Sequence, residues 1–250
     1  MVLHARERTK IDPVGVQPAA EGEKVGVADA VGLAPHPRTL EERGLNEFET
    51  GPHRARDATF QGLDRRLVIG PAAAAIPADA ADPAAMAAAI AEARTRLGPI
   101  AVIHWNAYGG SETGDLLAAD PAAVGRVFNV AILGLLAAVQ AALPDLKAAE
   151  DGAVLVTNGA FGDMSPQMDQ LAINLKSMGV ALANAAKAKL VGLLAQALKD
   201  EGVYVGEVTV AGAVKGTAWA RGGEGIDPAR IAGAFWDLRQ GRGEIRARIS

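Results

Sequence analysis

The chain has 250 residues, half of them hydrophobic, and a formal net charge of −4. This length and apolar content are sufficient for one domain with a sizeable core. The absence of cysteine excludes disulfides, thiolate metal sites and a cysteine nucleophile. Lys and Arg are scattered and the histidines lack metal-ligand spacing, so the sequence predicts neither a nucleic-acid partner nor a metal site.

The N-terminal third has the weakest patterns. Residues 1–23 are rich in charge, Pro and Gly and predict a mobile leader, followed by a single domain over residues 24–250. We expect a first strand at Lys24–Val27, a second at Leu45–Glu49 and a short third strand within Ala72–Ala78.

The clearest signals surround the middle of the chain. Asp82–Leu97 has an N-cap Asp followed by Pro, apolar residues at helical spacing and a stop at Gly98, which predicts a helix. The unbroken apolar run Ile100–Ile103 is typical of a strand buried on both faces of a parallel sheet. Residues 104–108, which include His104, Trp105, Asn106, Ala107 and Tyr108, would then lie at the rim of a binding crevice.

The second half alternates strands and helices. Asp120 and Pro121 predict the start of a helix that continues to Ala142 and is apolar on nearly all sides, so it is buried or contacts a partner subunit. Its most apolar part, Val130–Leu143, is too short to span a bilayer. The further predicted elements are, in order, a strand at Gly152–Thr157, a helical region at Leu171–Lys199, a strand at Val203–Val210, a helix starting at Asp227 and Pro228, and an edge strand at Ile245–Ile249.

This alternation predicts an α/β fold with a doubly wound parallel sheet covered by helices on both faces. The N-terminus lacks the apolar core of a signal peptide, so we expect a soluble, cytoplasmic protein that does not bind membranes.

Several strings resemble the short-chain dehydrogenase/reductase family, namely GPIAVIHWNA, VFNVAILGLLAAVQAALP, GAVLVT and AAKAKLVGLLAQALKDEGVYVGEVTVAG. The resemblance implies a Rossmann-type fold in a divergent family member. It also implies hydride transfer between NAD or NADP and a small alcohol or carbonyl substrate.

The family uses Asn, Ser, Tyr and Lys in catalysis, and this chain departs from that set. The relay Asn falls on Ala131, and the Ser falls on Asn158 or Gly159, of which Asn158 could donate a hydrogen bond to the substrate carbonyl. The Tyr is missing in every register. Tyr108 at the rim is either a displaced acid or an aromatic lid on the crevice.

Two lysines compete for the family's Lys position. Counting from the preceding strand reaches Lys176, with Ala172 at the Tyr position, whereas AAKAKL points to Lys187, with Ala183 at the Tyr position. In one continuous helix both lysines would share a face, about 16 Å apart along the axis.

The cofactor loop is also degraded, since the glycines of GxxxGxG fall on Ala28, Gly32 and Ala34. A cation after the second strand would favour the 2′-phosphate of NADP, although NAD is not excluded. The residues that the resemblance assigns to cofactor binding are Gly32, Arg54, Arg56, Asp79, Asn106, Ala107 and Thr217.

Two hypotheses follow. The first is an active NAD(P)-dependent short-chain dehydrogenase/reductase in which Lys176 or Lys187 holds the ribose, Asn158 polarises the carbonyl, and water or Tyr108 supplies the proton. The second is a non-catalytic, nucleotide-sensing or structural relative. In that case the apolar helices around Ala131–Ala142 and Leu190–Leu198 would support self-association as a homo-oligomer.

Overall fold

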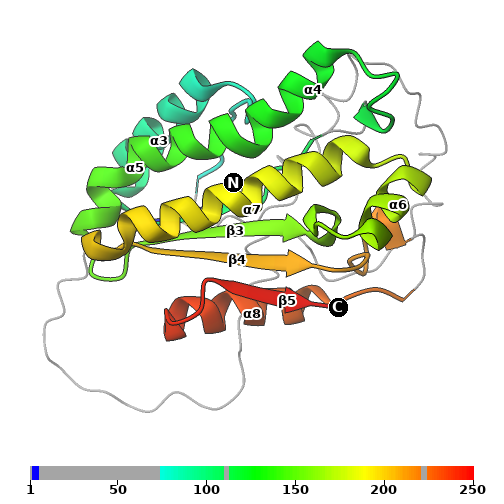
Figure 1. Ribbon diagram of the computed structural model, residues 1–250. Helices are drawn as coiled ribbons and strands as arrows, with labels where there is room; N and C mark the ends of the chain where they lie inside the picture. Colours follow the sequence, from blue (N-terminus) through cyan, green and yellow to red (C-terminus); the bar gives the residue numbers. More distant parts are fainter. Residues whose placement is uncertain (1, 6–73, 110–112, 221–223) are drawn as a thin grey trace, which may run out of the picture. The chain divides into compact units, whose positions relative to one another are not determined.

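The computed structural model describes residues 2–5, 74–109, 113–220 and 224–250, which all belong to one compact unit (Figure 1). The predicted strands at Lys24–Val27 and Leu45–Glu49 lie outside the described residues. So do the loop with Gly32, the cations Arg54 and Arg56, and the predicted boundary at residue 23.

The described sheet has the order β1-β2-β3-β4-β5. Strands β2 to β5 run parallel, which confirms the predicted parallel sheet, whereas β1 pairs with β2 in the antiparallel direction. Strand β1 comes from the segment predicted to be a leader. The bounds are Val2–Ala5 for β1, Ile100–Trp105 for β2, Ala153–Gly159 for β3, Tyr204–Val210 for β4 and Arg246–Ile249 for β5.

The helices predicted from Asp82 onward are found, with changes at their ends and one interruption. They are α3 (Pro83–Leu97), α4 (Pro121–Phe128), a π-helical segment (Asn129–Gly134), α5 (Leu135–Ala148), α6 (Pro166–Asn174), α7 (Met178–Leu198) and α8 (Pro228–Gly241). A short 3₁₀ turn, Ala160–Gly162, follows β3.

Three helices begin with the Asp-Pro pair that the sequence predicted. Asp82, Asp120 and Asp227 each accept a hydrogen bond from the backbone N–H two residues further on, at 2.9 to 3.0 Å. The following Pro occupies the first turn, where a helix needs no N–H donor. Local chemistry therefore fixes these three helix starts.

The structure corrects two predicted elements. Residues 74–79 form no strand, because Ala has low β propensity and Pro77 lacks the N–H that a ladder requires. The predicted helix Leu171–Lys199 is interrupted between α6 and α7, where Lys176 adopts a left-handed backbone conformation with φ of 49°. Lys176 therefore lies in a turn and not on the face of a long helix.

Strand β2 is longer than its apolar run predicted. It continues through His104 and Trp105, and Trp105 is fully buried. The His104 ring lies 4.4 Å from the ring of Phe235 on α8, and its Nε2 is 3.1 Å from Thr157 Oγ1. These two residues are part of the sheet, so the rim begins only at Asn106.

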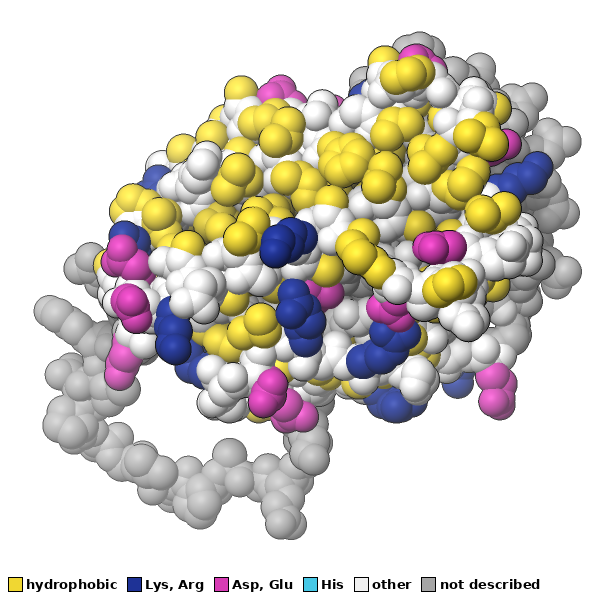
Figure 2. Space-filling view, in the orientation of Figure 1, with side chains coloured by type: hydrophobic (Ala, Val, Ile, Leu, Met, Phe, Trp, Pro, Cys, Tyr) yellow, Lys and Arg dark blue, Asp and Glu magenta, His cyan; other side chains and the backbone are white. Residues whose placement is uncertain are grey.

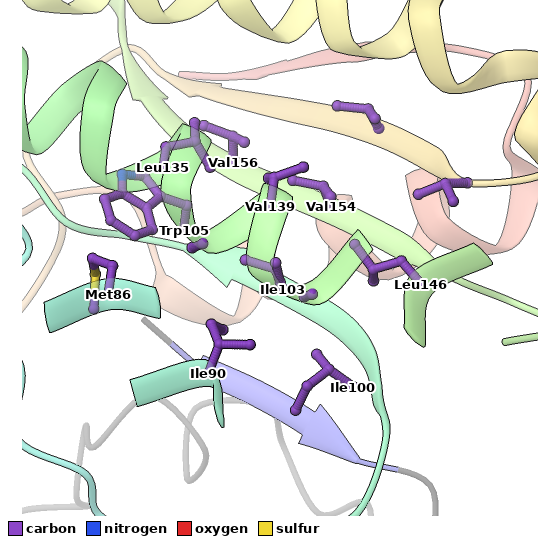
Figure 3. Packing of buried hydrophobic residues seen from close by; sticks show 14 of the residues in the cluster. Met86, Ile90, Ile100, Ile103, Trp105, Leu135, Val139, Leu146, Val154 and Val156 are labelled. Carbon is purple, nitrogen blue, oxygen red and sulfur yellow. The ribbon is translucent and has the colours of Figure 1, made fainter. Parts of the chain in front are cut away.

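The core occupies both faces of the sheet. On one face, α3, α5 and α7 cover β2, β3 and β4, and Figure 3 shows side chains such as Ile90, Leu135 and Val154 converging there. On the other face, Phe235 and Leu238 of α8 pack on alternate strand residues. Helices on both faces force the functional groups toward the strand ends and the helix–sheet interface.

Two helical stretches are unusually apolar. Pro121–Ala148 and Met178–Glu201 are long and apolar enough to cross a membrane by length and composition. The first stretch is longer than Val130–Leu143, the apolar run that the sequence predicted to be too short to span a bilayer. Core helices of soluble proteins meet the same criterion. In the described residues, 39% and 28% of their most apolar windows are buried.

Candidate active site

A polar cluster lies between α7 and the sheet, in surroundings that are otherwise apolar. Asn158 on β3, Asn184 and Lys187 on α7, and Glu207 on β4 are each no more than 6% exposed. In the parallel register Val156 faces Glu207 and Asn158 faces Thr209, so both polar side chains point to the α7 side of the sheet. Buried polar groups require partners, and hydrogen bonds join Asn158 to Glu207 and to the backbone of Asn184.

Asn158 is held by three hydrogen bonds. Its Nδ2 donates to the backbone oxygen of Asn184 and to Glu207 Oε1, both at 3.0 Å, and its Oδ1 accepts from the N–H of Gly159 at 3.0 Å. An amide nitrogen has only two hydrogens. To donate a hydrogen bond to a carbonyl substrate, Asn158 must therefore release one of these partners.

The structure separates the two candidate lysines. Lys187 lies on the inner face of α7, one turn beyond Asn184, and is 3% exposed. Lys176 is exposed in the turn between α6 and α7. Lys187 is thus the lysine that reaches the buried cluster, with Ala183 one turn before it at the Tyr position.

Burial lowers the pKa of Lys187 from 10.5 to about 8, while attraction to the Glu207 carboxylate partly offsets this effect by raising it. Desolvation disfavours the charged ammonium, and an opposite charge nearby favours it. A lysine with a pKa close to neutral pH can exchange a proton under ordinary conditions.

Glu207 is a member of the site that the sequence analysis did not identify. Its Oε1 accepts hydrogen bonds from Asn158 and, at 3.2 Å, from Thr209 Oγ1. Its Oε2 lies 3.6 Å from Arg246 Nε on β5 and has no hydrogen-bond partner among the described residues. The available signal was a single charged residue within the apolar strand VYVGEVTV.

Two positions assigned to the family's catalytic residues form an apolar contact instead. Ala131 and Ala183 are buried in one small cluster with Val127, and Ile132 packs against it. Ala131 lies in the π-helical segment between α4 and α5, a type of irregularity often found at functional sites. The helix is therefore irregular at Ala131, the position where the family resemblance places the relay Asn.

The two tyrosines lie outside this cluster. Tyr108 is 64% exposed, and its Oη accepts a hydrogen bond from Trp219 Nε1 at 3.4 Å, which links the loop after β2 to the segment after β4. Tyr204 begins β4 and donates from its Oη to the backbone oxygen of Glu244 at 2.7 Å. Burial raises the pKa of Tyr204.

The remaining residues predicted to bind the cofactor differ from one another in exposure and in hydrogen bonding. Asn106 is exposed at the end of β2, and its side chain makes no hydrogen bond to other described residues. Ala107 packs against the core. Asp79 Oδ1 accepts from the N–H of Ala81 before α3, and the Thr217 hydroxyl donates to the backbone oxygen of Val214 at 2.7 Å.

We tested these residues against the nicotinamide dinucleotide that the family resemblance implies. An open side-chain amide at Asn106 and a buried ammonium at Lys187 are donors suited to ribose hydroxyls, so their chemistry fits that end of the molecule. The residues predicted for the phosphate end, Gly32, Arg54 and Arg56, lie outside the described part of the chain.

Four parallel strands with helices on both faces, an open polar group after β2 and a buried lysine on α7 define a Rossmann-type α/β domain. The family model for short chain dehydrogenases matches residues 53–221, more than half of the chain. The chain belongs to the short chain dehydrogenase family. The match begins after the predicted glycine loop at Ala28–Ala34. No curated protein sequence matches this chain.

Solved structures support the same fold. The chain is similar to an NADPH-bound short chain oxidoreductase from Pseudomonas aeruginosa with an atypical catalytic center, with a TM-score of 0.60, 19% identity and coverage of 77% of this chain and 80% of that one. It is also similar to a metagenomic short-chain oxidoreductase in complex with NADP, with a TM-score of 0.58, 19% identity and coverage of 77% and 79%. A Brucella ovis short chain oxidoreductase with a partially ordered NAD has a TM-score of 0.54, 21% identity and coverage of 70% and 78%.

Proposed function

We propose that the protein is an oxidoreductase of the short-chain dehydrogenase type that uses a nicotinamide dinucleotide and acts on a small alcohol or carbonyl substrate. The observation that carries this proposal is Lys187. It is buried on α7, and its pKa is lowered to about 8 by burial. A perturbed lysine beside the strand ends of a Rossmann-type sheet has the chemistry of a working site.

Each residue has a definite role in this proposal. Lys187 and Asn106 would hold a ribose of the dinucleotide through their N–H donors. When bound, the dinucleotide supplies or accepts the hydride. Asn158 would orient the carbonyl by releasing one of its two donated hydrogen bonds, and water or Tyr108 would carry the proton. Lys176 is disfavoured as the ribose-binding lysine because its side chain is exposed.

The preference for NADP over NAD rests on sequence position. Arg54 and Arg56 follow the predicted second strand, where a cation would bind the 2′-phosphate of NADP. The solved structures of similar fold contain NADPH, NADP or NAD. We therefore propose NADP as the preferred cofactor and expect NAD to bind more weakly.

A second candidate is a relative that binds a nucleotide and performs no chemistry. Two observations favour it: Ala131 and Ala183 form an apolar contact where the family places polar catalytic residues, and Asn158 has both amide hydrogens engaged. Such a protein would bind cofactor without turning over any alcohol or carbonyl.

The test combines binding with turnover. NADPH and NADH are titrated into the protein by calorimetry, and cofactor oxidation is then followed with a panel of ketones and aldehydes. Lys187→Met should lower turnover by at least about a hundredfold. Lys189→Met, on the exposed side of α7, is the matched control and should leave turnover unchanged. Cofactor binding without turnover would favour the second candidate, and no binding would reject both nucleotide proposals.

We further propose that the protein is a soluble, cytoplasmic homo-oligomer that associates through the outer surface of α4, α5 and α7. Figure 2 shows hydrophobic side chains spread over these helices. Among them, Leu133, Leu182 and Leu193 are 44%, 41% and 56% exposed. Exposed hydrophobic side chains gathered on one face can mark a protein interface.

A further inference from the structure

A groove lies between the second half of α7 and the start of β4. It is lined by α7 and the 3₁₀ turn after it (Lys199–Glu201), by the first residues of β4 and by the segment that joins α8 to β5. Its volume is about 430 Å³, which is sufficient for a small molecule. The groove is separate from the candidate active site, because Ala153 pairs with Tyr204 at this end of the sheet whereas Asn158 pairs with Thr209 near the other.

The charged side chains that line the groove are both cationic. They are Lys199 and Arg242, and Gln196 adds a neutral amide. Lys199 is exposed, and its ammonium makes no hydrogen bond or ion pair with the other described residues. Arg242 donates from Nη2 to the backbone oxygens of Gly152 and Gly202, at 3.1 and 2.9 Å, so its Nε and Nη1 remain for a ligand.

Neighbouring carboxylates do not neutralise these two cations. Glu201 is paired with Lys147 at 2.8 Å, whereas Asp200 and Glu244 are exposed and do not line the groove. Figure 2 shows Lys and Arg side chains along the border between α7 and the strands β4 and β5. In a chain with a net charge of −4, a groove whose charged lining is cationic favours an anionic ligand.

An apolar surface lies next to these cations. The apolar side chains that line the groove include Ala195, Val203 and Val205. A further cation, Arg246, lies beside the lining residue Gly192, where an added Cβ would be 3.3 Å from the Arg246 Nη2. This guanidinium is already engaged, because its Nη2 donates to the backbone oxygen of Ala188 on α7 at 2.8 Å. The open cations are therefore Lys199 and Arg242.

We propose that this groove is a second ligand site, which binds a small organic anion with a carboxylate or phosphate group and a short apolar body. Lys199 and Arg242 hold the anionic group, since ammonium and guanidinium groups form strong hydrogen bonds with both kinds of anion. The apolar body lies on the valines of β4. The proposal does not rest on the proposed function, because Lys199 and Arg242 have no role in it.

The test is an NMR titration of the ¹⁵N-labelled full-length protein with three probes that share one apolar chain, namely hexanoate, hexyl phosphate and 1-hexanol. The anions should shift the backbone amide signals of Gly202 and Gly243, which line the groove, with a dissociation constant of about 1 to 10 mM. The neutral 1-hexanol should bind at least about tenfold more weakly, because it lacks the charge. The anion that binds more tightly shows which of the two groups the site prefers.

A charge reversal tests the role of the lysine. Lys199→Glu should weaken binding of both anions at least about fivefold and leave 1-hexanol unaffected. Lys189→Glu, an exposed change on α7 outside the groove lining, is the matched control and should bind all three probes as the wild type does. If Lys199→Glu does not fold, as judged by circular dichroism, Lys199→Met decides in its place, with an expected loss of at least about twofold.

Three results would overturn the proposal. They are equal binding of the anions and 1-hexanol, equal anion affinity in the wild type and the Lys199 variant, and no signal shift at about 50 mM of either anion.

Discussion

The buried ammonium of Lys187 should make the stability of the protein depend on pH in a defined direction. Its pKa falls from 10.5 to about 8 on folding, chiefly because burial disfavours the charge. Below about pH 8 the folded protein must keep this proton in a poorly solvated place. The difference between the two pKa values corresponds to about 3 kcal/mol of lost stability below about pH 8.

The sign follows from the number of bound protons. Between pH 8 and 10.5 the unfolded chain retains the Lys187 proton while the folded protein loses it, so the free energy of unfolding rises with pH. From about pH 7.5 to about pH 9.5 this group alone should add about 2 kcal/mol. The range stops there because the raised pKa of Tyr204 acts in the opposite direction above about pH 10.

The perturbation is Lys187→Met, which removes the titrating group and keeps a side chain of similar length. The assay is urea denaturation of wild type and variant at several pH values in this range. We expect the rise of about 2 kcal/mol in the wild type and in the exposed control Lys189→Met, and its loss in Lys187→Met. Equal pH slopes for wild type and Lys187→Met would mean that Lys187 does not lose its proton in this pH range on folding.

Three further outcomes are expected. Gly134→Ala should destabilise the protein by about 3 kcal/mol in urea denaturation, because a Cβ there would overlap a backbone carbonyl oxygen. Gly125→Ala, with open space around it, should stabilise α4 by about 0.5 to 1 kcal/mol. Equal effects of the two substitutions would contradict the packing described. Leu133→Glu with Leu193→Glu should shift sedimentation velocity profiles from oligomer to monomer, and an unchanged profile would rule out association through this surface. Tyr108→Phe should lower the turnover number less than about threefold if water carries the proton, whereas a hundredfold loss would assign that role to the Tyr108 hydroxyl.

Much of the fold could be predicted because its signals are local. The Asp-Pro pairs at Asp82, Asp120 and Asp227 set helix starts through bonds within a few residues, and the apolar runs before Asn106 and Asn158 match buried strands. The break between α6 and α7 could not be predicted, since a left-handed Lys176 has no local sequence signal of the kind that glycine provides. The same holds for the π-helical segment.

The candidate site was predicted only in part. The resemblance brought Asn158 and Lys187 to the same region, but the choice between two lysines needed the break in the helix. Glu207 was missed because its place in the site depends on contacts with β3 and β5, which are distant in sequence. Side chains that act through tertiary contacts leave only a weak signal, here one charge in an apolar strand.

The central claim is that Lys187 and the strand ends around it serve a nicotinamide dinucleotide. Calorimetric titration of NADPH into wild type, Lys187→Met and the control Lys189→Met tests it most directly. We expect binding to wild type and control with a dissociation constant below about 1 mM, and at least tenfold weaker binding to Lys187→Met. No heat of binding to the wild type at millimolar NADPH, or equal affinity in all three proteins, would contradict it.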